Sequence, residues 1–471
     1  MPLLPPRQIQ KWEQAGLHQG HDEPDESDSS TEAESSSPQL YHYLPDIKAI
    51  SLEPPTSSIF CLPDKVLGLI FVNTLDPLVR QWYFAPAVDR PPMVLTHVCK
   101  WWRRVAISMP MLWSFNAYLG SVHSQIALYR LFLNRGRGMA PLIITFDGSY
   151  STELDAAQDL FFSHIHLWAD VKISLGPSIC SKLAVLHPGD ALLLKKVHID
   201  SNNTRVAQSD VHQLITFLAL SPNLSALSWD RDIPTMFYSV QWQNVTRFST
   251  ATRLHTGECW ALLSCFTQIE EIIFSNYVCS PIRMYTRSIL VDKTLRSLSI
   301  RGSNPVEFLD TVTLTCLNAL RLSAPDDIYS IQRLVERSGC TLRHLIIEGV
   351  VDDDRDLLGF LRLECFDSIH SLRFTQPGDF NDKTAGLLTW HRSGDSPTKL
   401  FPLLSVLEFE ECHTTDGVFS RMILSRWRGS ESELKCVRLT KGCLRNKPVD
   451  EACLSSLITD DIQFVWKSAA W

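Results

Sequence analysis

Leu224 opens the segment LSALSW (224–229), in which apolar residues occupy the first, fourth and sixth positions. The pattern recurs, and from residue 194 onward successive copies begin 21 to 35 residues apart. Alternation of apolar and other residues over the last positions predicts a strand with one buried face. The copies begin at Leu194, Leu224, Val245, Ile269, Leu295, Leu317, Leu342, Ile369, Leu404 and Leu434, with two earlier candidates at Met139 and Trp168.

The segments between the copies, such as 211–222 and 327–340, carry apolar residues at helical spacing. The repeated units resemble leucine-rich repeats, although the usual Asn or Cys beyond the strand is clear only at Asn202 and Cys412. The resemblance implies strands on a concave side and helices on a convex side. The fold class we expect is α/β, with residues 121–471 forming an irregular leucine-rich-repeat-like solenoid (a horseshoe). A C-terminal helix and strand would cap it, and the segment 377–400 is expected to be an irregular loop.

A different pattern precedes the repeats. Residues 62–71 (LPDKVLGLIF) have Pro63 where a first helical turn tolerates proline, followed by apolar residues at helical spacing. After a proline-rich break, a second helix is predicted through Val94, Val98 and Trp102, ending before Pro110.

These two stretches resemble the F-box of basidiomycete fungal F-box proteins over residues 59–120, with two departures, a Lys at position 65 and a long connection between the helices. The resemblance implies docking on the S-phase-kinase-associated adaptor protein, and through it on a cullin ubiquitin ligase. From periodicity alone, the same face could instead pack on the following domain. The residues that would contact the adaptor, or frame its contacts, are Leu62, Pro63, Val66, Leu67, Ile70, Val98, Cys99 and Trp102.

Charge and composition exclude several classes of protein. The net charge is -8, and seven acidic residues and six serines lie in 21–37, so residues 1–58 are predicted to be a disordered acidic leader. The remainder has no cationic excess, which argues against nucleic-acid binding. Neither a secretory signal nor a membrane span is expected, and the 13 cysteines show no zinc-site spacing. We therefore expect a cytoplasmic or nuclear protein without a metal.

Motifs of catalysis are not recognisable in the sequence, which contains no GxxxxGK, GxGxxG, HExxH or GxSxG. His164 with His166, and Cys412 with His413, are interpreted as packing or surface residues. We therefore expect no catalytic residues, no cofactor and no enzymatic activity in the chain itself.

Cationic residues recur at the non-apolar positions of the central copies. Arg321, Arg373 and Arg438 share one position of the repeat, and Arg296, Arg343 and Lys435 share another, so stacked strands would align them. Such a stripe could receive an acidic or phosphorylated target segment. An ordinary solvated surface of mixed charge is the alternative, because Glu270, Glu271, Glu408 and Glu410 lie on the same face. The candidate target-binding residues are Arg296, Arg301, Arg321, Arg343, Arg373 and Arg438.

Together these features predict a non-catalytic, substrate-recognition subunit of an SCF-type cullin ubiquitin ligase that captures an unidentified protein target for ubiquitin-dependent degradation. The alternative is a protein-binding scaffold that delivers nothing for ubiquitination. Sequence does not separate the two.

Overall fold

The molecule is described here by a computed structural model. It describes residues 62–74, 86–119, 126–146, 152–200, 206–279, 290–323, 327, 329–348, 359–375, 380–390, 400–410, 412–427, 434–440, 444, 446–457 and 463–467. The predicted acidic leader, residues 1–58, lies outside the described residues, as does Asn202.

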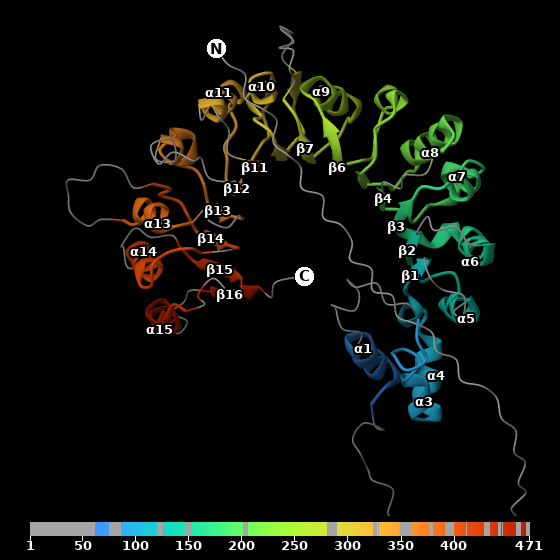
Figure 1. Cartoon of the computed structure of the whole chain (residues 1–471). Coiled ribbons are helices and arrows are strands. Elements are labelled where there is room, and N and C mark those ends of the chain that lie inside the picture. The colour runs from blue at the N-terminus through green and yellow to red at the C-terminus, as the bar shows by residue number, and fades with distance from the viewer. Residues whose placement is uncertain are drawn as a thin grey trace, which may run out of the picture. The chain divides into compact units, whose positions relative to one another are not determined.

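Most of the described strands belong to one large parallel sheet, in which fourteen strands follow one another in chain order (Figure 1). Two short strands, β8 (Leu290–Asp292) and β10 (Val312–Leu314), pair separately. The strands of the large sheet are β1 (Asn116–Leu119), β2 (Leu142–Phe146), β3 (Trp168–Ser174), β4 (Lys196–Asp200), β5 (Ala226–Trp229), β6 (Arg247–Leu254), β7 (Glu271–Tyr277), β9 (Ser297–Gly302), β11 (Ala319–Ser323), β12 (His344–Glu348), β13 (Ser371–Phe374), β14 (Val406–Phe409), β15 (Cys436–Thr440) and β16 (Gln463–Lys467).

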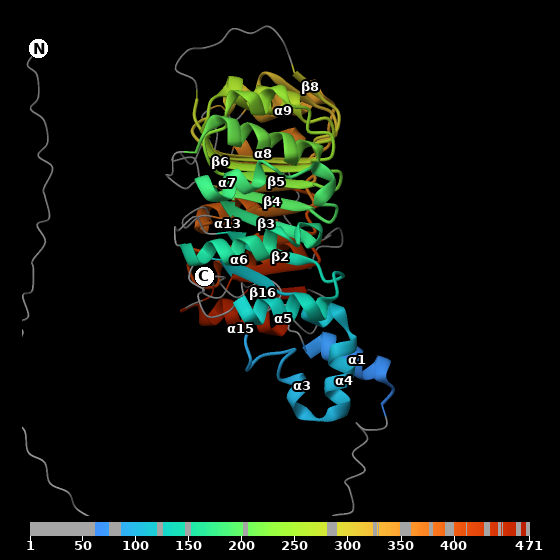
Figure 2. The same cartoon turned by 90° about the vertical axis from the view of Figure 1, so that its right-hand side faces the viewer.

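Helices connect the strands, and from α5 onward the labelled helices lie on the same face of the sheet (Figures 1 and 2). The chain is therefore a mixed α/β protein with a large parallel sheet. The α-helices are α1 (Asp64–Thr74), α3 (Leu95–Val98), α4 (Lys100–Ser108), α5 (Ile126–Gly136), α6 (Thr152–Phe162), α7 (Pro177–Leu183), α8 (Gln208–Leu220), α9 (Thr256–Cys265), α10 (Val306–Leu309), α11 (Tyr329–Ser338), α13 (Asp382–Leu388), α14 (Val418–Trp427) and α15 (Pro448–Leu457). Short 3-10 helices are η2 (Pro110–Trp113), η3 (Ile165–Leu167), η4 (Pro188–Asp190), η5 (Thr235–Ser239) and η6 (Glu364–Phe366).

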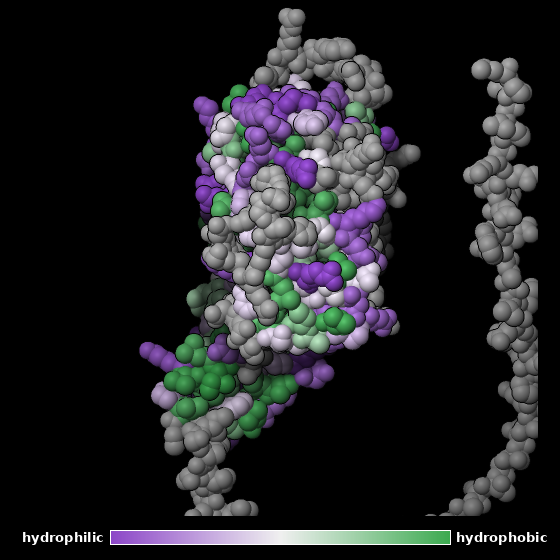
Figure 3. All heavy atoms as spheres, turned by 90° about the vertical axis from the view of Figure 1, so that its left-hand side faces the viewer, coloured by the Kyte–Doolittle hydropathy of each residue, from purple (hydrophilic) through white to green (hydrophobic). Residues whose placement is uncertain are grey.

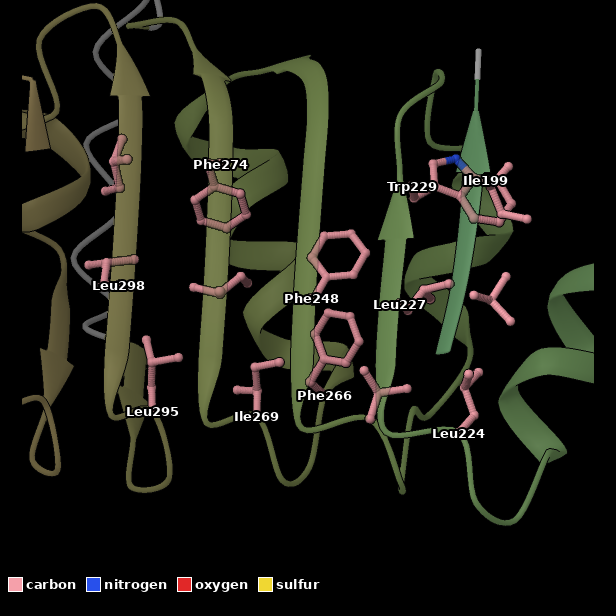
Figure 4. Packing of buried hydrophobic residues seen from close by; sticks show 14 of the residues in the cluster. Ile199, Leu224, Leu227, Trp229, Phe248, Phe266, Ile269, Phe274, Leu295 and Leu298 are labelled. Carbon is pink, nitrogen blue, oxygen red and sulfur yellow. The ribbon is translucent and has the colours of Figure 1, made fainter. Parts of the chain in front are cut away.

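The six-residue pattern sets the register of the sheet. Residues at its fourth position pair across neighbouring strands, as Leu227 does with Phe248, and Leu298 with Leu320. Residues at the first, fourth and sixth positions form rows of buried side chains (Figure 4). Burying each large apolar side chain stabilises the fold by about 1.5–3 kcal/mol. Met139 is the exception, because its side chain is exposed.

Near the C-terminal end, the predicted terminal helix and strand are present as α15 and β16. The prediction of an irregular loop over 377–400 was wrong in part, because α13 forms there. Asn381 caps this helix by accepting hydrogen bonds from the backbone nitrogens of Lys383 and Thr384.

The helical segment before the sheet follows the sequence prediction with one correction. The second predicted helix is two helices, α3 and α4, separated by Cys99 in an extended conformation. The Cys99 sulfur accepts a hydrogen bond from the backbone nitrogen of Trp102 at 3.4 Å, so it caps α4. Trp113 is fully buried and lies under the guanidinium of Arg135 on α5, at 4.4 Å from the ring centroid, which ties this segment to the first helix of the sheet.

Candidate functional site

Helix α1 divides its apolar residues between a buried and an exposed face. Leu67 and Phe71 are fully buried, and the Phe71 ring lies 4.9 Å from the Trp102 ring of α4, centroid to centroid. The indole nitrogen of Trp101 donates to Asp64 Oδ1 at 2.7 Å and fixes α1 against α4 a second time. These contacts explain which side of α1 faces inward.

The opposite side of α1 leaves Val66, Leu69 and Ile70 exposed at 40%, 63% and 38%. Val98 on α3 is 56% exposed. We call Val66, Leu69 and Ile70 the α1 face, and Figure 3 shows hydrophobic residues gathered on this end of the molecule. Leu69 was missed by the sequence analysis, although it lies three residues after Val66 and four after Lys65, the spacing of one helical side.

The other predicted adaptor-binding residues differ in their exposure. Leu67 is part of the core, so it can frame a contact but not make one. Cys99 and Trp102 are half-buried, and both make contacts inside the helical segment. Cys99 caps α4, and the Trp102 ring packs against Phe71. Leu62 is half-buried and Pro63 is exposed at the start of α1.

The first predicted cationic set does form a column across the sheet. Arg321 and Arg373 both pair in register with Ile346, and Arg373 and Arg438 both pair with Glu408. The three arginines therefore lie on alternate strands, with an apolar or an acidic residue between them.

Carboxylates neutralise this column, which corrects the expectation of an open cationic stripe. Glu348, whose side chain is 7% exposed, forms ion pairs with Arg301, whose Nε lies 2.9 Å away, and with Arg321. Burial raises the pKa of Glu348, and the positive charge of Arg301 opposes that rise. The sequence analysis missed Glu348, which directly follows the six-residue pattern of its repeat. It lies two residues after Ile346 in β12, so its side chain is on the same face of the sheet as the arginine column.

A second part of the same network involves Glu408, whose side chain is 8% exposed. It lies 3.5 Å from Arg373 Nε and 3.6 Å from Arg438 Nη1. Glu410 also pairs with Arg373. Arg301, Arg321, Arg373 and Arg438 therefore form ion pairs within the sheet, and each buried carboxylate has two arginine partners. Losing both partners would leave that carboxylate buried and uncompensated.

The second predicted set, Arg296, Arg343 and Lys435, lies where the strands begin, directly before β9, β12 and β15. Arg343 and Lys435 are exposed, and Arg296 is exposed with its Nε at 4.0 Å from Glu270. No ion pair holds Arg343 or Lys435 among the residues that the structure describes. This set therefore differs from the neutralised column.

Two of the residues considered for catalysis make hydrogen-bonding contacts with residues close by in the sequence. His164 Nδ1 hydrogen-bonds the carbonyl oxygen of Leu160 at 2.8 Å, and the Cys412 sulfur lies 3.3 Å from the Thr414 hydroxyl. Within the described ranges, no group of three or more His, Cys, Asp or Glu residues is arranged to hold a metal ion. The described helices include none with the length and apolar character needed to cross a bilayer.

No protein-family model matches the sequence, and no curated protein is significantly similar to it.

Proposed function

We propose that the chain is a substrate-recognition subunit of an SCF-type cullin ubiquitin ligase. Its helical segment would dock on the S-phase-kinase-associated adaptor as an F-box, and its repeats, as a leucine-rich-repeat-like solenoid, would hold a protein target. The observation that carries the proposal is the α1 face, three exposed apolar residues on a small helical segment that Trp113 and Arg135 join to the sheet.

Exposed apolar residues that lie together are typical of a contact with another protein. Covering them removes apolar surface from water, and a few such residues at the centre of an interface supply most of its affinity. The resemblance of residues 62–71 and 98–113 to an F-box supports the adaptor as the protein that covers the α1 face. The chain would act by proximity, because holding a target near a ubiquitin-charged enzyme raises the effective concentration of the target's lysines.

Co-purification of the full chain with the adaptor tests the proposal. The double variant Leu69→Asp, Ile70→Asp places two charges in the interface and should abolish the complex. Both residues are exposed, so the variant should remain folded, as circular dichroism can verify. Val185→Asp is the matched control, because Val185 is 74% exposed and lies outside the helical segment.

Loss of the complex in the double variant, with the control unaffected, would support the ligase subunit. A wild-type chain that never binds the adaptor would contradict it. If the chain binds the adaptor but no cullin-dependent ubiquitination of any co-purified protein occurs, the scaffold is the better account.

A further inference from the structure

We infer that the strand-start column of the sheet binds a short, extended, acidic polypeptide segment, which deepens the proposed function by naming the chemistry of the target. The column consists of one residue from each of six neighbouring repeats. Backbone hydrogen bonds of 2.8 to 2.9 Å join each member to the next. The members are Arg296, Asn318, Arg343, His370, Ser405 and Lys435.

The column is free of acidic residues. The residue that follows the column in each of the six repeats is Ser297, Ala319, His344, Ser371, Val406 or Cys436, so none of the twelve positions carries a carboxylate. The central column of the same repeats differs, since Glu348, Glu408 and Glu410 neutralise its arginines. Among the described residues, Arg343 and Lys435 therefore have no carboxylate partner, whereas Arg296 lies 4.0 Å from Glu270.

One end of the column limits the path of its ligand. On the β7 side it meets Glu270 and Glu271, which would repel a longer anion. Six strands at about 4.8 Å per step span about 24 Å, the length of about seven extended residues. A continuous polyanion such as a nucleic acid fits this arrangement poorly, because the acidic residues at β7 interrupt its path.

The spacing of the cations also sets the pattern of the ligand. Arg296 and Arg343 are two strands apart, or about 10 Å, which matches about three extended residues. Arg343 and Lys435 are three strands apart, or about 14 Å, which matches about four. The geometry therefore selects acidic groups near positions i, i+3 and i+7, held by charge-assisted hydrogen bonds.

Fluorescence anisotropy with the purified full chain tests the inference. The probe is a labelled peptide of about eight residues, with Glu at those positions and Ser or Gly elsewhere. The double variant Arg343→Glu, Lys435→Glu should weaken binding by about tenfold or more, and added salt should weaken binding to the wild type. The control Arg130→Glu, Arg421→Glu makes the same change in net charge on exposed residues of α5 and α14 and should leave the affinity unchanged.

Equal loss in the two double variants would overturn the inference, since it would indicate a diffuse effect of net charge. Tighter binding of single-stranded DNA than of the peptide would also overturn it. A phosphoserine version that binds more tightly, and loses this gain in the Arg343→Glu, Lys435→Glu variant, would assign the acidic groups to phosphates rather than carboxylates. The assay needs no adaptor, so its outcome is independent of the ligase proposal, and the variant should still co-purify with the adaptor if that proposal holds.

Discussion

Arg426 is a buried cation whose hydrogen bonds go to backbone carbonyl oxygens. Its side chain donates to Leu388 O at 2.6 Å, to Leu400 O at 2.9 Å and to Phe401 O at 3.4 Å. Burial lowers the pKa of Arg426 to about 9, so the guanidinium is charged at neutral pH. It thus fixes the ends of the segment between α13 and β14.

Replacing this side chain should be costly. Arg426→Met leaves three carbonyl oxygens without their donors, and we expect the free energy of unfolding to fall by about 3 kcal/mol. Urea denaturation measures the change. Arg421→Met on the same helix is the control, because Arg421 is exposed, and a similar loss in both variants would contradict the role given to Arg426.

His198 predicts a dependence of stability on pH. Burial lowers its pKa from the ordinary value of 6.5, although Asp230, at 3.5 Å, opposes this change. Below pH 6.5 the unfolded chain therefore binds a proton that the folded chain does not, and the folded state loses stability. The variant His198→Gln has no side chain that titrates at this position, so it lacks this loss of stability. Urea denaturation at about pH 8 and about pH 5.5 should show a larger acid loss for the wild type than for the variant; parallel losses would contradict the lowered pKa.

At the scale of the element, α1 carries a buried and an exposed leucine whose contributions to stability should differ. Leu67→Ala removes a fully buried side chain and should lower the free energy of unfolding by about 2–5 kcal/mol. Leu69→Ala removes an exposed side chain and should change it by about 0.5 kcal/mol or less. Thermal and urea denaturation of the two variants measure the difference. Comparable losses would mean that Leu69 packs inside the protein and that the α1 face is not available to a partner.

The strands of the sheet could be predicted from the spacing of apolar residues in the sequence. The fourth and sixth residues of the repeated pattern are buried because a strand that packs on helices places alternate residues inward. The first residue lies before the strand and is buried in the turn that leads into it. Two features were not predictable. The break at Cys99 depends on backbone conformation that apolar spacing does not encode, and the exposure of Met139 depends on what covers it in three dimensions.

At the scale of the whole molecule, the candidate site was only partly predictable. The columns follow from aligned repeats, so the shared repeat position of Arg321 and Arg373 is enough to place them in one column. Their charge state could not be predicted in this way, because Glu348 is 27 residues from Arg321 in sequence and reaches it only across paired strands. Only the ion pairs in the structure therefore separate the exposed cations at the strand starts from the neutralised arginine column.

The last strand provides a prediction about the sheet as a unit. β16 pairs with β15 along Cys436–Thr440, and α15 is held against α14 by Asp416, whose Oδ1 accepts from the backbone nitrogens of Val449 and Asp450 at 3.0 and 2.9 Å. Deleting residues 448–471 would expose the edge of β15 together with buried Leu439. Unpaired strand edges recruit other chains.

We therefore expect the deletion variant to self-associate with rising concentration, as light scattering during size-exclusion chromatography would measure. Deleting residues 1–58 instead is the control, because it removes more of the chain and should leave this strand edge paired. If the C-terminal deletion keeps the molar mass of a single chain across the concentration range while retaining its circular dichroism, then β15 does not need β16 to cover it, and the terminal helix and strand are dispensable to the sheet.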